Sequence, residues 1–198
     1  MTIREKSKVV SLRGPAGYHK VTEKDESGHA VTIDTDHHLV HVGRYFIVDD
    51  IDIEVDIAAP KIWYFETPDD DTRIHIYFQG SVSNAGTFEL FEGGSVSVLG
   101  SAVSPTNLDR NSTRESKMNF YRDSTVGDLG TFRMGVFLGG ASPTPVPIGG
   151  SADRRTEMIL KKAEKYIVRF SPVNNDTVVN ISFKWYEAEY PSDDIIDP

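Results

Sequence analysis

The stretch RYFIVDDIDIEVD, residues 44–56, decides the fold class because apolar and acidic residues alternate along it. One parity holds the aliphatic side chains Ile51, Ile53, Val55 and, just beyond the stretch, Ile57. The other parity holds the carboxylates Asp50, Asp52, Glu54 and Asp56. Successive side chains of a β-strand point to opposite faces. We therefore predict a strand whose aliphatic side chains face the core and whose carboxylates face water.

Short runs of β-branched and aromatic residues recur along the chain, separated by turns rich in Gly, Asn, Asp, Ser and Pro. Further strands are predicted at 61–67, 73–83, 87–92, 95–100, 117–122, 131–138, 166–173 and 178–188. Residues 153–165 could form a helix, but a strand at 156–161 followed by a turn is favoured. Loops are predicted at 100–115, 123–130 and 139–152. The pattern is typical of an all-β fold, an antiparallel two-sheet β-sandwich that is jelly-roll-like.

Three regions of the chain differ in composition. Residues 1–34 have weak periodicity, so we expect an extended N-terminal arm with at most one short strand. Residues 35–190 hold the alternating runs and form the predicted sandwich domain, and residues 191–198 form an acidic C-terminal tail. Residues 1–20 carry a single acid, Glu5, against five basic side chains, Arg4, Lys6, Lys8, Arg13 and Lys20. Such an arm could dock on an acidic surface, or it could be a solvated terminus.

The bulk composition of the 198 residues excludes several function classes. A net charge of −9 argues against general nucleic-acid binding. The chain has no Cys, which excludes disulfides, thiolate metal sites and Cys nucleophiles. No apolar run approaches the roughly 20 residues that span a bilayer, so we expect no membrane association. The first residues, MTIREKSKVV, lack the apolar stretch of a signal peptide, and we expect the chain to stay in the cell that makes it.

Two groups of residues could hold a metal ion. His37 and His41 would share one face of a strand and could bind zinc, nickel or copper together with His75, which would allow a metal-dependent enzyme. The run Asp69–Asp71 could bind calcium, although no EF-hand spacing follows it. Polar strand residues and a turn after Pro68 explain both groups more simply. We therefore expect no metal, no cofactor and no catalytic residue, since nucleophile, phosphate and dinucleotide motifs are also absent from the sequence.

Consecutive aromatic residues raise another alternative. Trp63, Tyr64 and Phe65 cannot all face one side of a strand, so at least one of them should be exposed or lie in an interface. An outward Trp63 or Tyr64 could stack on a sugar, as in a carbohydrate-binding module. Burial at a subunit interface, where Tyr and Trp are enriched, is the interpretation we favour.

Most of the chain, residues 35–190, resembles a set of small accessory virion proteins of tailed phages. The resemblance lies in an ordered series of short motifs. In this chain the motifs are His38-Leu39-Val40-His41-Val42-Gly43, His75–Phe78, Leu90-Phe91-Glu92-Gly93, Asn107-Leu108-Asp109-Arg110-Asn111, Ile159-Leu160-Lys161 with Tyr166-Ile167-Val168, and Trp185-Tyr186-Glu187. Each motif alone is weak, whereas their shared order is more specific.

The resemblance implies a capsid decoration, or cement, protein that binds the lattice of the major capsid protein and stabilises the shell. It implies a place on the capsid surface of the virion after assembly in the host cytoplasm, and a homo-oligomer such as a dimer or trimer. A tail or baseplate component, or a receptor-binding adhesin, is the alternative. As candidate capsid contacts we name the arm residues Arg4, Lys6, Lys8 and Arg13, and the loop residues Asn107, Arg110 and Asn111.

Overall fold

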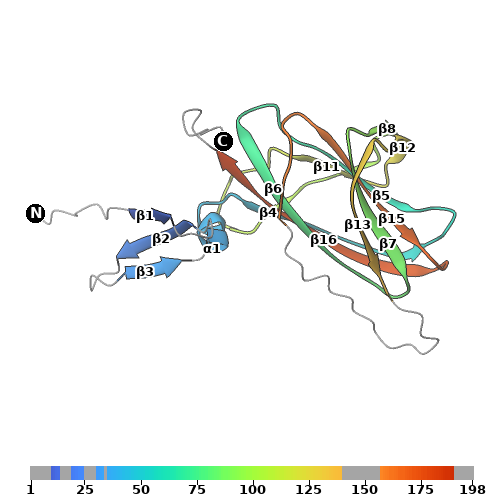
Figure 1. The fold of residues 1–198 in the computed structure, drawn as a ribbon, viewed down its shortest axis with the longest axis horizontal. Helices are drawn as coiled ribbons and strands as arrows, with labels where there is room; N and C mark the ends of the chain where they lie inside the picture. Colours follow the sequence, from blue (N-terminus) through green and yellow to red (C-terminus); the bar gives the residue numbers. More distant parts are fainter. Residues whose placement is uncertain (1–9, 14–18, 25–29, 34, 140–156, 190–198) are drawn as a thin grey trace, which may run out of the picture.

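The computed structural model describes residues 10–13, 19–24, 30–33, 35–139 and 157–189. Two large antiparallel sheets pack face to face across one aromatic core, which confirms the predicted all-β sandwich (Figure 1). The narrower expectation of jelly-roll connectivity stays a prediction. No helix among the described residues is long and apolar enough to cross a membrane.

The chain passes repeatedly between the two sheets. In spatial order, the five-stranded sheet contains β10 (Thr106–Asn107), β4 (Tyr45–Val55), β16 (Thr177–Glu189), β6 (Thr72–Val82) and β14 (Met158–Ile159). The six-stranded sheet contains β13 (Thr131–Leu138), β7 (Gly86–Glu92), β15 (Lys165–Pro172), β5 (Lys61–Glu66), β11 (Asn119–Arg122) and β9 (Ser101–Val103). The late strands β15 and β16 lie between earlier strands in the two sheets, so neither sheet is complete until the C-terminal strands have paired.

The core between the sheets is aromatic. Trp63 and Phe65 of β5 face Phe183 and Trp185 of β16, and all four are fully buried. Their rings pack at centroid distances of 5.7 Å for Trp63–Phe183 and 6.3 Å for Phe65–Phe183. Aromatic side chains bury a large apolar area for each ordered residue, which suits a sandwich that has no disulfide.

A two-stranded ribbon covers the outer side of the six-stranded sheet. β8 (Ser95–Val98) follows β7 and precedes β9, while its partner β12 (Thr125–Asp128) follows β11 and precedes β13. The ribbon therefore leaves one side of the sheet, crosses β15 and β5, and rejoins the sheet on the other side (Figure 1). We call it the strap. Beneath it a second apolar cluster is buried, formed by Ile62, Tyr64, Phe91 and Ile167.

All four corners of the strap have a left-handed backbone. Gly93, Gly100, Asp123 and Gly130 have φ angles of 76°, 79°, 59° and 78°. At Gly130 a Cβ would lie only 2.5 Å from the carbonyl oxygen of Glu92, so a side chain is excluded by contact as well as by φ. Because both ends of the strap are held in the six-stranded sheet, it is part of the fold and not a free hairpin.

The strand β4 is confirmed, but our prediction of its buried face was wrong. Phe46, Val48 and Asp50 point into the core, whereas Ile51 and Ile53 are each 64% exposed. The aromatic start of the strand fixes the inward parity, and this parity carries Asp50 inward. A register shift between Thr177 and Val179 on β16 then returns Val55 to the buried side.

The N-terminal region also differs from expectation. It contains three paired strands, β1 (Val10–Arg13), β2 (His19–Lys24) and β3 (Ala30–Ile33), where at most one was predicted. This N-terminal sheet stands to one side of the sandwich, next to a short helix, α1 (Thr35–His41) (Figure 1). The α1 residues were predicted to be extended, which is wrong.

Other departures are small. The predicted loops at 100–115 and 123–130 contain the short strands β9, β10 and β12. The strand favoured at 156–161 is confirmed in a shorter form, as β14. Residues 140–152 of the third predicted loop, and the tail at 191–198, lie outside the described residues.

Candidate functional site

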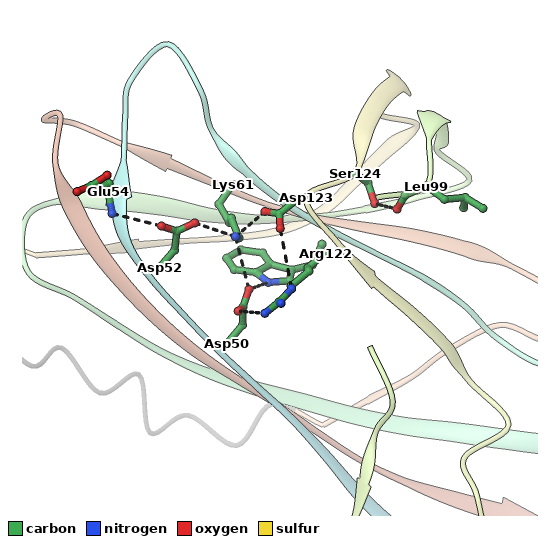
Figure 2. A network of polar contacts seen from close by, with 9 residues as sticks. Asp50, Asp52, Glu54, Lys61, Leu99, Arg122, Asp123 and Ser124 are labelled. Atoms are coloured by element: carbon green, nitrogen blue, oxygen red, sulfur yellow. Dashed lines mark hydrogen bonds and ion pairs between the residues drawn. The ribbon is translucent and has the colours of Figure 1, made fainter. Parts of the chain in front are cut away.

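The densest group of charges in the described part of the chain surrounds Lys61, at the end of the core next to a strap corner (Figure 2). Lys61 begins β5 with the inward parity of Trp63, and it is only 9% exposed. Its Nζ lies 2.8 Å from Asp52 Oδ2 on β4 and 2.5 Å from Asp123 Oδ1. One ammonium group therefore joins the two sheets to a corner of the strap.

Asp50 is the buried member of this network. It is 6% exposed, and its Oδ2 accepts a hydrogen bond of 2.7 Å from the Trp63 indole Nε1. Lys61 Nζ lies 3.8 Å from the same oxygen, and Arg122 Nη1 lies 3.4 Å from Asp50 Oδ1. The carboxylate is thus compensated on both oxygens, as a buried charge must be.

The charges hold one another in their ionised forms. The hydrogen bond from Lys61 lowers the pKa of Asp52 below its usual value. Burial alone would lower the pKa of Lys61, but its hydrogen bonds to Asp123 and Asp52 outweigh burial and raise that pKa. An amine nucleophile or base must lose its proton near neutral pH. Lys61 keeps its proton, so the arrangement is suited to a structural ion-pair link and not to amine catalysis.

The sequence contained one signal for this network that we did not use. Asp50 and Asp52 were predicted to be solvated, which is wrong for Asp50 because it faces the core. Lys61 alternates with Trp63 and Phe65 along the strand, so its side chain could be predicted to lie on the same inner face of β5. A buried cation needs a carboxylate from the facing strand.

The motifs behind the resemblance meet in two clusters that hold the fold. At the first, Asn107 Nδ2 donates to the Gly43 carbonyl oxygen at 2.9 Å, beside α1. Nearby, buried Glu187 accepts hydrogen bonds from the Ser116 hydroxyl and the Lys117 amide, at 2.7 and 2.8 Å. These contacts tie the loop after β10 to the link between α1 and β4.

The second motif cluster surrounds Glu92 of β7. Lys161 Nζ lies 2.7 Å from Glu92 Oε1, and the Tyr166 hydroxyl donates to Glu92 Oε2 at 3.1 Å. The same hydroxyl accepts from the Lys161 amide at 2.9 Å. Burial acts to raise the pKa of Glu92, but hydrogen bonds from Lys161, Arg133 and Tyr166 lower it below the usual value. Glu92, Lys161 and Tyr166 therefore have a structural role, because each of them is bonded to another residue of the motifs.

The predicted contact residues fall into three groups. Asn107 is buried by the bonds just described, whereas Arg110 and Asn111 are exposed. The backbone of Arg13 belongs to β1, and Arg4, Lys6 and Lys8 lie outside the described residues. Among the predicted loop contacts, Arg110 and Asn111 are therefore the side chains that a partner can reach.

A groove of about 540 Å³ lies beside this loop. Its walls come from residues 102–105, 107, 112–116 and 118–121, and they are mainly polar. Ala102, Val103, Pro105, Met118 and Phe120 supply the apolar part of the lining. Hydroxyl and amide groups dominate the lining and only Arg114 and Glu115 are charged, which gives the groove little net charge.

The histidines do not gather into one site. His37 and His41 lie one turn apart on α1, with their Nε2 atoms 2.9 Å apart. His75 lies on β6, where its Nδ1 is 2.5 Å from Glu157 Oε1 and 2.9 Å from the Tyr186 hydroxyl. In the part of the chain that the structure describes, no three His, Asp or Glu residues are arranged to hold a metal ion.

In the predicted calcium site and the predicted sugar-binding site, the candidate residues contact other parts of the same chain. Lys117 Nζ lies 2.8 Å from Asp70 Oδ2, and this bond, with those from Thr72, lowers the pKa of Asp70 to about 2. Lys162 Nζ lies 3.9 and 3.5 Å from carboxylate oxygens of Asp69 and Asp71.

Trp63, Tyr64 and Phe65 are all buried, because β5 is covered on one side by the core and on the other by the strap. An exposed Trp63 or Tyr64 is therefore excluded, and the favoured interpretation of burial at a subunit interface is wrong, because the chain buries these residues itself.

A scan against protein-family models, a search of curated proteins and a search of solved structures each gave no match to this chain.

Proposed function

We propose that this protein is a phage virion structural protein of the capsid decoration type. It would bind the lattice of the major capsid protein on the outer surface of the capsid and act by adding contacts to the assembled shell. A protein that binds only the assembled state stabilises that state by mass action.

The observation that carries the proposal is the division of the molecule into two bodies. The sandwich holds the buried charges of Lys61 and Asp50 in internal ion pairs, and a small N-terminal sheet stands apart from it (Figure 1). Residues 1–24, which include β1 and β2, carry six basic residues against two acids. A basic element beside an acidic body can contact two neighbouring surfaces at once, which is what fastening a lattice requires.

The motif order in the sequence supports the proposed virion role through a shared architecture. The motif residues Gly43, Asn107, Glu92, Tyr166 and Glu187 hold the chain in this fold. They support a shared architecture more strongly than a shared partner. Partner contacts are expected from the exposed residues beside them, Arg110 and Asn111, and from the basic arm.

Co-sedimentation with shells assembled from the major capsid protein of the same genome tests the proposal. We expect the full-length protein to pellet with shells, saturate, and occupy fixed lattice positions in electron micrographs. A variant with Arg4, Lys6, Lys8 and Arg13 changed to Ser should lose most binding. The matched control changes two exposed lysines of the sandwich, Lys162 and Lys165, to Ser. Failure of the folded wild-type protein to bind shells would contradict the proposal.

The alternative of a glycan-binding adhesin has lost the aromatic residues on which it rested. Tyr64 and Trp63 are 1% and 0% exposed, so neither can stack on a sugar in this fold. A tail or baseplate role predicts the same kind of protein contact on a different lattice, and the shell experiment separates the two.

A further inference from the structure

The two outer faces of the sandwich differ, and the face without a strap carries an apolar strip. Ile51 and Ile53 of β4 are each 64% exposed, Ile57 is 55% exposed and Val178 of β16 is 37% exposed. Ile51 is paired with Asn180, so these side chains lie where the last part of β4 meets the first part of β16. We call this group the isoleucine strip.

The strip lies in an acidic part of the chain. Residues 49–57, 79–83 and 176–182, which form this end of the sheet, contain no Lys or Arg. They contain six acids, of which Asp50 and Asp52 are paired with Lys61. The remaining four, Asp49, Glu54, Asp56 and Asp176, surround an apolar centre. A partner for this surface should be basic and should carry aliphatic residues.

The N-terminal sheet of the same chain has that chemistry. Across residues 1–33, which span the whole sheet and its connections, six Lys or Arg residues against four acids give a net charge of +2. The strands β1, β2 and β3 hold Val10, Leu12, Val21, Ala30, Val31 and Ile33. Three strands of four to six residues are too small to be stable alone and need a second surface to pack on.

The sheet cannot reach the strip of its own chain in this fold. The N-terminal sheet and α1 precede the first residue of β4, Tyr45, whereas the strip begins at Ile51 and follows the strand to its end. Eight residues of strand between Tyr45 and Ile53 span about 26 Å. In Figure 1 the sheet lies beyond the opposite end of β4. A second copy of the chain can supply the sheet without refolding.

We propose that the N-terminal sheet of one copy packs on the isoleucine strip of another copy. The contact joins two different surfaces, so it closes either by reciprocal exchange between two copies or around a ring. Charge attraction between the basic sheet and the acidic rim makes the association sensitive to ionic strength. The inference concerns self-association, and it holds or fails independently of binding to capsid shells.

Sedimentation velocity and light scattering of the full-length protein test this contact. The wild-type mass is expected to exceed the 22.0 kDa monomer and to fall as salt is raised. The double substitution Ile51→Asp/Ile53→Asp should raise the dissociation constant about 100-fold or more, because it removes two aliphatic contacts and adds like charge to the rim. The matched control is Val98→Asp on the strap, where Val98 is 58% exposed.

Retention of the wild-type mass by Ile51→Asp/Ile53→Asp would overturn the proposal, and so would a wild-type protein that is monomeric at all concentrations and salt levels. Because Ile51 and Ile53 are exposed, both variants should keep the circular dichroism spectrum of a folded sandwich. A monomeric protein that still binds shells through the strip would make the capsid lattice the occupant, which also contradicts a second copy. Loss of shell binding with self-association intact would leave this contact standing and count against the capsid role alone.

Discussion

The two outer faces of this sandwich are built from similar strands, but one face is covered and the other is exposed. The six-stranded sheet is covered by its own strap, under which Ile62, Tyr64 and Ile167 are buried. No described strand forms a strap over the five-stranded sheet, and Ile51 and Ile53 are exposed on it. Strand patterns alone do not distinguish these faces, because alternation reports two sides of a strand and not what lies above each side.

The difference has a source in chain order. The strap exists because two long ribbons, β7–β9 and β11–β13, pair along their whole length and bend at the same four corners. No comparable ribbon lies over the five-stranded sheet among the described strands. The covered face therefore contributes to the stability of the monomer, whereas the uncovered face is available to contribute to binding.

The largest effect is expected inside the sandwich, at the residue next to Ile51. Asp50→Ala should lower the free energy of unfolding by about 3–5 kcal/mol, because it leaves the Trp63 indole without its acceptor and removes the buried member of a charge network that also holds Lys61 and Arg122. Asp49→Ala, on the opposite face of the same strand, is the matched control and should cost far less. Urea unfolding followed by tryptophan fluorescence measures both, and equal costs would contradict the inward parity of Asp50.

The next effect compares the faces directly. Ile167→Ala beneath the strap should cost about 2–5 kcal/mol, because its side chain is fully buried and leaves a cavity. Ile51→Ala on the uncovered face should change the free energy of unfolding of the monomer by less than about 0.5 kcal/mol. The same urea experiment, at a concentration where the protein is monomeric, gives both values. A large cost at Ile51 in the monomer would show that its own chain covers it.

A smaller effect tests the strap itself. Gly130→Ala should cost about 1–3 kcal/mol, since its φ is 78° and the new Cβ would meet the backbone of residues 92–94. Gly93→Ala shares the positive φ but has no atom within 4 Å of the new Cβ, so it isolates the backbone term and should cost less. Similar costs for the two variants would mean that the strap corner is not tightly packed.

The smallest effect is pH dependent. The pKa of Asp52 is lowered in the folded state, so the stability that this carboxylate contributes is present above its unfolded pKa of about 3.9 and is lost as pH falls through the folded value. Asp52 is about one-third exposed, so solvent limits its contribution to about 1 kcal/mol or less. The difference in unfolding free energy between wild type and Asp52→Asn should therefore be constant from pH 5 to 7 and shrink below pH 4. A difference that grows on acidification would contradict the ion pair with Lys61.

The sequence predicted the sandwich and most of its strands, because alternation and turn residues are local properties. Prediction from the sequence failed where segments distant along the chain determine which side chains are buried. The inward parity of β4 follows from Phe46 and Val48 at its start, and the burial of Tyr64 follows from a strap formed some 30 to 60 residues later in the chain. A single strand cannot report either fact.

The candidate sites show the same division. Asn107 was predicted to contact a capsid partner, but it is buried and donates a hydrogen bond to the Gly43 carbonyl oxygen. The Lys61 network was missed because its carboxylates come from β4 and from the corner at Asp123, which are 9 to 62 residues from Lys61 in sequence. Spacing rules recognise sites that are built within one segment and do not reach sites assembled between sheets.

The central claim is that the uncovered face of the five-stranded sheet is the surface through which copies of this protein associate. Side-chain footprinting by hydroxyl radicals, read out by mass spectrometry, tests it most directly when the dissociated and the assembled protein are compared. We predict that labelling of Ile51, Ile53 and Val178 falls on assembly, while Val98 on the strap and Phe137 on β13, which are 58% and 61% exposed, stay labelled. Unchanged labelling at Ile51 and Ile53, with protection at Val98 or Phe137 instead, would contradict the claim.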